Sequence, residues 1–231
     1  MPKTETRQEI LVYADWIGLK ENPTLLGKLY STKVRGNEIF SFEYSEEWLQ
    51  SKFAQVIDQD LEFFSGPHYL NDKKNNFGIF LDSSPDRWGR VLMKRREAIL
   101  ARKEKRQEKT LLESDFLLGV FDENRAGGLR FKLSEDGKFL NEDSSLAAPP
   151  IASLGELQEA SLMLERDEDI NDSEHIKWLN MLMAPGSSLG GARPKASISD
   201  NGDLWIAKFP SSKDNKDIGA WEIVVHTLAE R

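Results

Sequence analysis

The chain has 231 residues, enough for one large or two small domains, and its formal net charge of −8 argues against a protein built to coat nucleic acid. The absence of cysteine excludes disulfide bonds, cysteine-ligated zinc and thiol catalysis. No apolar run reaches membrane length and charged residues interrupt the first ten positions, so we expect a cytoplasmic protein that makes no contact with a membrane.

The N-terminal region is predicted to be rich in β-structure. Residues 9–17, 25–31 and 37–45 have the apolar patterning of strands. Ser45 then opens a short helical turn, because serine is a good N-cap. The segment 61–80 has the glycine, proline and asparagine content of loops.

A helix is predicted to begin near residue 83. Ser83 is a suitable N-cap, Pro85 fits the first turn, and Asp86 lies three residues after the cap. Residues 87–109 carry ten Lys/Arg against three acids, which indicates either a face for a partner or a solvated helix. We expect Trp88 in a core, on an apolar face that also contains Val91, Leu92 and Ile99.

The middle of the chain is predicted to continue with a helix, a hairpin, a linker and two more helices. The hairpin turns at Glu135-Asp136-Gly137, and the linker has the composition NEDSSLAAPP. These elements correspond, in order, to residues 111–124, 126–140, 141–150, 153–169 and 173–184.

The stretch APGSSLGGARPK, residues 184–195, has the composition of a phosphate-binding loop or a turn. Gly186 and Gly191 have the spacing of a Walker A loop, but the next two residues are Ala192 and Arg193 instead of Lys and Ser/Thr. No G-x-G-x-x-G is present, so a Rossmann site is also excluded. The glycines alone favour a turn.

The segment after the glycines strengthens the nucleotide interpretation. A predicted hairpin ends in a strand on which Ile206 and Lys208 share one face, and Glu222 follows in a final helix. A glycine loop, a strand lysine and a helix glutamate occur in this order in the small lobe of protein kinases. Taken singly, Lys208 and Glu222 are better explained as solvent-exposed residues. We expect the final helix to bury a stripe formed by Ile218, Trp221, Val225 and Leu228.

Ordered segments along essentially the whole chain resemble the HipA-like serine/threonine kinases of bacterial toxin–antitoxin systems. Gly128 stands where that family usually has alanine. The segments are FSFEYSEEWL, SSPDRWGRVLMKRRE, LLGVFDENRAGGLRF, SSLGGARPKA, WIAKFP and DIGAWEIVVHTLAE.

The resemblance implies an α+β fold with an N-terminal β-rich subdomain at residues 1–145 and a protein-kinase-like small lobe at residues 146–231. It implies ATP and Mg²⁺ as cofactors, with Glu222 as the partner of the nucleotide lysine. It also implies autophosphorylation of a loop serine, Ser188 by alignment, although the adjacent Ser187 is an alternative. Arg193 or Lys195 would add charge beside the loop. The ATP-binding residues carried over are Gly186, Ser188, Leu189, Gly190, Gly191, Ala192, Ile206 and Lys208.

The activity implied by the resemblance is phosphoryl transfer from ATP to a protein. In well-studied members of the family the protein substrate is an aminoacyl-tRNA synthetase. The expected partner is a HipB-like helix-turn-helix antitoxin, and DNA would be reached only indirectly, through that antitoxin.

The family's large catalytic lobe, which carries its catalytic and magnesium-binding aspartates, is expected to be absent, because the sequence stops at Arg231 inside the helix that bears Glu222. No catalytic residue is therefore assigned in this chain, and we expect a fragment without useful kinase activity. No metal ligand is assigned either, since His68, His175 and His226 lack ligand spacing. The alternative is a non-catalytic regulatory module that pairs with an antitoxin or with a separate catalytic chain.

Overall fold

The computed structural model describes residues 6–16, 23–34, 36–70, 74–166, 172–183 and 193–230. Its contacts divide the chain into two compact units. The first unit contains residues up to 85 together with residues 110–143. The second contains residues 86–109, residues 144–185 and the chain from residue 190 onward.

The first unit is built on a five-stranded antiparallel sheet with the strand order β4-β3-β2-β1-β5, so the fold is mixed α+β as expected. The three predicted N-terminal strands are confirmed. The predicted hairpin at residues 126–140 is wrong, because β5 pairs with β1, with Phe131 opposite Val12. The strands are β1 Thr6–Ala14, β2 Thr24–Val34, β3 Asn37–Tyr44, β4 Pro67–Tyr69 and β5 Leu129–Lys132.

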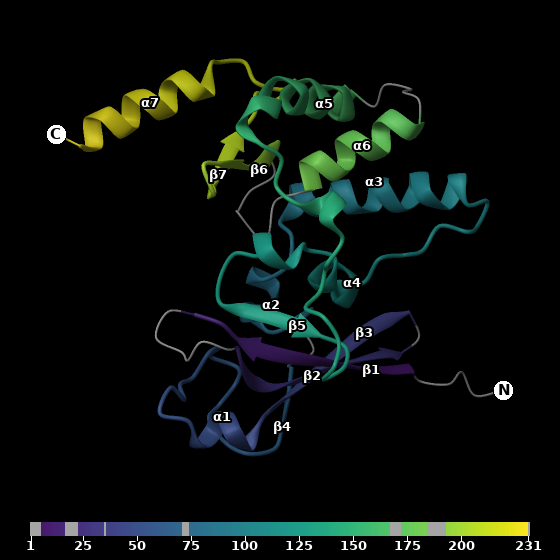
Figure 1. Ribbon diagram of the computed structural model, residues 1–231, viewed down its shortest axis with the longest axis vertical. Coiled ribbons are helices and arrows are strands. Elements are labelled where there is room, and N and C mark those ends of the chain that lie inside the picture. Colours follow the sequence, from purple (N-terminus) through teal and green to yellow (C-terminus); the bar gives the residue numbers. More distant parts are fainter. Residues whose placement is uncertain are drawn as a thin grey trace. The chain divides into compact units, whose positions relative to one another are not determined.

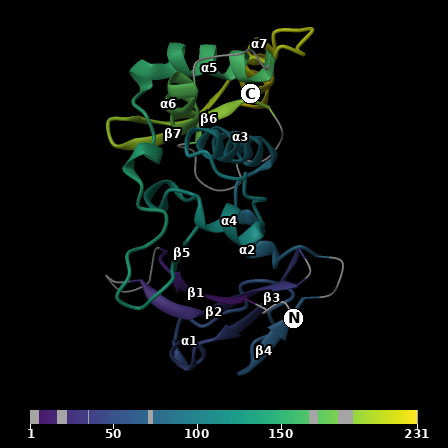
Figure 2. The ribbon, with the colours of Figure 1, turned by 90° about the vertical axis from the view of Figure 1, so that its right-hand side faces the viewer.

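Short helices accompany this sheet. Helix α1 (Glu46–Gln50) begins as predicted, because the Ser45 hydroxyl oxygen accepts a hydrogen bond of 3.0 Å from the Trp48 amide. Helices α2 (Gly78–Asp82) and α4 (Glu113–Leu118) lie over one face of the sheet in both views (Figures 1 and 2).

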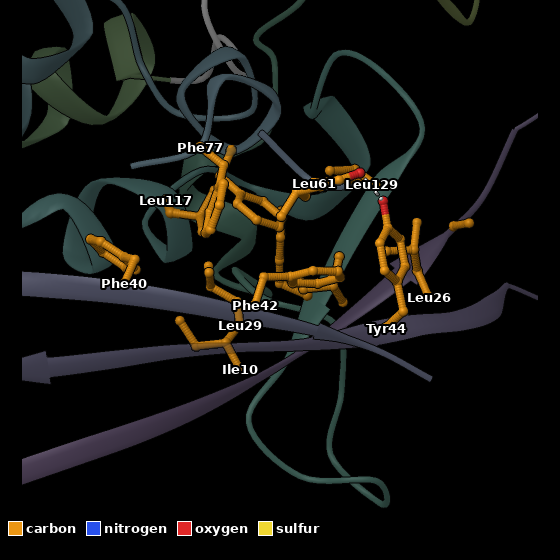
Figure 3. Close-up of a cluster of buried hydrophobic side chains, with 14 of the residues drawn as sticks. Ile10, Leu26, Leu29, Phe40, Phe42, Tyr44, Leu61, Phe77, Leu117 and Leu129 are labelled. Atoms are coloured by element: carbon orange, nitrogen blue, oxygen red, sulfur yellow. Dashed lines mark hydrogen bonds between the residues drawn. The ribbon is translucent and has the colours of Figure 1, made fainter. Parts of the chain in front are cut away.

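The core of the first unit forms where these helices meet the sheet. Figure 3 shows Ile10, Leu29 and Phe42 on the strands beside Phe77 and Leu117 from the helical side. Each of these five side chains is fully buried, and burial of such a side chain contributes roughly 1.5–3 kcal/mol. Strand alternation explains the set, since inward positions recur at every second residue.

Arg125 is a buried polar centre of the first unit. Its guanidinium donates hydrogen bonds to the carbonyl oxygens of Ser83 (2.7 Å), Val120 (3.1 Å) and Leu140 (3.0 Å). It also lies over the Phe131 ring, with 4.7 Å between the guanidinium carbon and the ring centroid. Burial lowers the pKa of Arg125 to about 10, which still leaves it charged at neutral pH.

The second unit combines helices with a two-stranded hairpin. Helix α3 packs against α6, and α6 packs against α5 and β6. The predicted hairpin and final helix are confirmed. The elements are α3 Arg87–Lys103, η2 Ser144–Leu146, η3 Ile151–Ser153, α5 Leu154–Arg166, α6 Asp172–Met183, β6 Lys195–Asp200, β7 Asp203–Lys208 and α7 Ile218–Ala229.

Helix α3 begins later than the sequence predicts. Its N-cap is Asp86, whose carboxylate accepts a hydrogen bond of 2.9 Å from the Gly89 amide. Ser83 instead ends α2 and donates its hydroxyl to the Ile79 carbonyl at 3.0 Å. Trp88 is buried as expected, together with Leu92 and Ile99, whereas Val91 is 40% exposed.

The expected domains, residues 1–145 and 146–231, differ from the two compact units in the segment 86–109, which packs within the second unit. This segment contains α3, whose apolar side chains find their partners on α6. Within the described ranges, no helix combines the length and apolarity needed to cross a bilayer.

Candidate functional site

The β6–β7 hairpin presents the predicted nucleotide lysine. The turn between its strands has Asn201 and Gly202 with φ angles of 51° and 91°, a left-handed pair suited to a tight hairpin. The register places Ile206 opposite Ser197 and Lys208 opposite Lys195. Ile206 and Lys208 therefore share one face of β7, two residues apart.

Lys208 and Glu222 form an ion pair between β7 and α7. The Lys208 Nζ donates to Glu222 Oε2 at 2.9 Å. Both side chains are about half exposed, at 56% and 52%. Helix α7 is held at its start by Asp217, whose side chain accepts from the Ala220 amide at 2.9 Å. The pair thus gives the ammonium of a strand lysine one fixed carboxylate partner on a helix.

A cavity of about 280 Å³ lies beside this pair. It lies at the start of α7, and its wall mixes three cationic with three acidic side chains. Cationic side chains next to a helix N-terminus favour the binding of an anion in the cavity. The neighbouring carboxylates orient these cationic side chains. The charged residues of the wall are Arg193, Lys208, Lys216, Asp214, Asp217 and Glu222.

The predicted glycine loop lies outside the described residues. This applies to Gly186, Ser188, Leu189, Gly190, Gly191 and Ala192, and to Ser187. Of the predicted ATP-binding and lysine-partner residues, the structure therefore places Ile206, Lys208 and Glu222. It brings Lys208 and Glu222 into contact and leaves Ile206 52% exposed on β7.

The predicted buried stripe of α7 is wrong. Trp221, Val225 and Leu228 are 58%, 62% and 62% exposed, and Ile218 is only partly buried. The described part of the chain buries no residue of α7. Helical periodicity identifies an apolar face but does not supply the surface that covers it. Strand β7 is similarly uncovered at Leu204, Trp205 and Ile206.

Lys195, expected to add charge beside the glycine loop, is instead buried against Asp86. Its Nζ lies 2.8 Å from Asp86 Oδ2, and the two side chains are 7% and 9% exposed. Arg193 pairs with Asp214 in the segment between β7 and α7. The sequence did not predict Asp86 and Asp214 as the partners of these two cations, since a local pattern does not show which distant side chain an aspartate will contact.

Each described histidine side chain lies beside a glutamate residue. His68 is buried, and its Nε2 lies 2.6 Å from the Glu62 carbonyl oxygen. His226 is exposed beside Glu230, while the side chain of His175 lies outside the described set. The described residues contain no cluster of three or more His, Asp or Glu able to hold a metal ion.

No protein-family model matches the chain, and no curated protein matches it. A functional hypothesis for the chain therefore depends on its motifs and on the geometry around Lys208.

Proposed function

We propose that the chain is the N-terminal portion of a HipA-like serine/threonine kinase, with a β-rich subdomain and a kinase-like small lobe. The observation that carries this proposal is the 2.9 Å ion pair between Lys208 and Glu222. It joins a strand lysine to a helix glutamate, and a glycine-rich stretch precedes both in the order used by protein kinases.

In this function the residues of the chain position ATP. Glu222 fixes the Lys208 ammonium, which binds phosphate oxygens as a point charge. Ile206, on the same face of β7, covers the base. The glycine-rich stretch at residues 186–192 would supply backbone amides as donors to the phosphates. Mg²⁺ bound with ATP would neutralise charge developing on the transferred phosphoryl group.

The proposed acceptor is a hydroxyl group on a protein substrate, with an aminoacyl-tRNA synthetase as the candidate suggested by the resemblance. The proposed partner is a HipB-like helix-turn-helix antitoxin, through which DNA is reached indirectly. Phosphate on Ser188 would place about −1.5 to −2 charges in a loop that faces other phosphates, and so expel ATP.

The exposed apolar surface of β7 and α7 favours a second candidate function. Trp205, Trp221 and Val225 are each more than half exposed, and large exposed apolar surfaces mark interaction sites. A non-catalytic module that pairs with an antitoxin, or with a separate catalytic chain, would use this surface without transferring phosphate.

Reading the gene beyond the codon for Arg231 separates the two functions. An in-frame continuation with H-x-D-like and D-F-D-like segments supports the kinase, and a stop codon there favours the binding module. The protein encoded by the whole reading frame is then incubated with labelled ATP and Mg²⁺. We expect Lys208→Ala to lower phosphoryl transfer on the order of a hundredfold, by loss of phosphate positioning. Exposed Lys103→Ala should leave transfer unchanged. Equal activity of the two variants would overturn the role of Lys208.

A further inference from the structure

Helix α7 is held in place by few contacts. None of its residues is buried in the described part of the chain, so apolar packing does not fix its orientation there. Two features join it to β7, the Lys208–Glu222 ion pair and the connection formed by residues 209–217. The geometry of that connection therefore decides whether Glu222 reaches Lys208.

The connection is anchored to α5 by one carboxylate. Glu165, near the end of α5, accepts a hydrogen bond of 2.7 Å from the Ser211 hydroxyl and one of 2.5 Å from the Ser212 amide. The two bonds end on different oxygens of the carboxylate, so both are made at once. Two hydrogen bonds to an ionised group are stronger than two neutral ones.

Further contacts brace the connection at the same place. The Asp214 carboxylate accepts from the Ser211 amide at 2.9 Å and pairs with Arg193, which lies just before β6. The buried Phe209 donates its amide to the Pro194 carbonyl at 2.9 Å. These contacts tie the connection to the hairpin, whereas Glu165 ties it to helix α5.

The ionised form of Glu165 is the form favoured in the folded protein. Burial raises the pKa of its carboxyl, but the hydrogen bonds from Ser212 and Ser211 outweigh this effect and lower the pKa below its usual value. The exposed Lys213 adds a favourable charge nearby. An ionised carboxylate suits a structural anchor, because it does not need a proton to form its bonds.

We propose that Glu165 is a positioning residue for the Lys208–Glu222 ion pair: it anchors the 209–217 connection to α5 and thereby sets where α7 begins relative to β7. The consequence for phosphoryl transfer rests on the proposed kinase function. The anchoring itself does not, because it is a property of α5, β7 and α7 in this chain.

The absence of cysteine allows a direct test. Leu204→Cys on β7 and Val225→Cys on α7 replace residues that are 54% and 62% exposed, so both accept a spin label without disturbing a core. Pulsed electron paramagnetic resonance then measures the distance distribution between the labels in the 231-residue chain. We expect Glu165→Ala to broaden or shift this distribution. Glu159→Ala, at an exposed position of the same helix, should leave it unchanged.

A second variant guards against loss of folding. Ser211→Ala removes one of the two bonds to Glu165 and should produce a smaller change in the same direction. The proposal is overturned if Glu165→Ala, folded by circular dichroism, gives the distribution of the unsubstituted double-cysteine chain. It is equally overturned if the Glu159→Ala control broadens the distribution as much.

The effect of Glu165 on phosphoryl transfer is tested separately, in the protein encoded by the whole reading frame. Glu165→Ala should lower kcat/KM for ATP by about 10- to 100-fold, as expected for a small misplacement of a positioning group. Glu165→Gln, which keeps one acceptor oxygen, should recover part of the loss. A changed label distance with unchanged activity would refute the kinase role of Lys208 but not the anchor. An unchanged distance would refute the anchor whatever the activity.

Discussion

Asp86 and Lys195, 109 residues apart in the chain, form a buried ion pair with 2.8 Å between Oδ2 and Nζ. The same aspartate caps α3 through its other oxygen, and the backbone carbonyl of Lys195 accepts from Trp88 Nε1 at 3.2 Å. One short region of α3 is therefore joined to β6 by a charge pair and a hydrogen bond.

The first prediction concerns this pair. Asp86→Ala leaves the Lys195 ammonium buried without its partner, which should cost about 3–5 kcal/mol of unfolding free energy. Loss of the helix cap adds about 1 kcal/mol. Urea denaturation measures the change, with Lys103→Ala as a surface control. A loss below about 1 kcal/mol would show that water or another group replaces Asp86.

The second prediction concerns Arg125, which donates to three backbone carbonyls. Arg125→Met keeps much of the volume but removes a donor from all three oxygens, of which the Val120 carbonyl still accepts from the Asn141 amide at 2.8 Å. Each buried group left unsatisfied costs about 1–3 kcal/mol. Arg125→Lys should rescue little, because an ammonium cannot reproduce the planar fork of donors. Thermal unfolding of both variants tests this, and a lysine variant as stable as the original protein would contradict it.

The third prediction is a pH dependence. The hydrogen bond from Arg106 is the main cause that lowers the pKa of Glu97 to about 2, from an ordinary value of 4.5. A lowered carboxyl pKa stabilises the fold above pH 4.5, and this contribution is lost as the pH falls toward 2. The melting-temperature difference between the unsubstituted chain and Arg106→Ala should therefore be constant near neutral pH and shrink below pH 4.5. A difference that grows in acid would reverse the assignment.

The fourth prediction separates stability from function at Lys208. Because the Lys208–Glu222 pair is about half exposed, breaking it should change the unfolding free energy by no more than about 1 kcal/mol. Chemical denaturation of Lys208→Ala in the 231-residue chain measures this. Unfolding of the variant at room temperature would mean that the residue is structural, and its loss of activity could not then be attributed to phosphate positioning.

The fifth prediction concerns nucleotide affinity. On the proposed function, the small lobe offers one wall of the ATP cleft, so the 231-residue chain should bind ATP–Mg²⁺ weakly or not at all. Isothermal titration calorimetry is the measurement. A Kd in the low micromolar range, roughly −8 kcal/mol, would show that one wall suffices.

Local signals in the sequence predicted much of the fold. Ser45 was a correct cap because its hydroxyl satisfies an amide three residues away, a distance visible in the sequence. The hairpin turn at Asn201 and Gly202 was also predictable from local sequence, since these two residues tolerate the left-handed backbone. The pattern at residues 83–86 predicted Ser83 as the cap of α3, whereas the cap is Asp86, and its partner Lys195 lies far along the chain.

Long-range pairing was not predictable from one sequence. A turn motif after an apolar run predicts a hairpin at residues 126–140. Strand β5 instead pairs with β1, which lies more than 100 residues earlier in the sequence. At the candidate site, the kinase-like order of a glycine-rich stretch, a strand lysine and a helix glutamate predicted the pairing of Lys208 with Glu222, whereas Glu165 gave no signal. In a sequence, a glutamate on an amphipathic helix looks the same whether or not a loop serine reaches it.

The insertion of residues 86–109 between two parts of the first unit constrains the order of events during synthesis. Strand β1 emerges from the ribosome early, but its neighbour β5 follows only after α3 has been made. Helix α3 in turn must wait for α6 and β6 before Trp88 and Asp86 are covered. Neither unit can therefore finish folding before the ribosome has passed well beyond its first residues, and pairing so remote in sequence is intrinsically slow. Nascent chains cut at residue 145 should be captured by chaperones more readily than chains cut after β6.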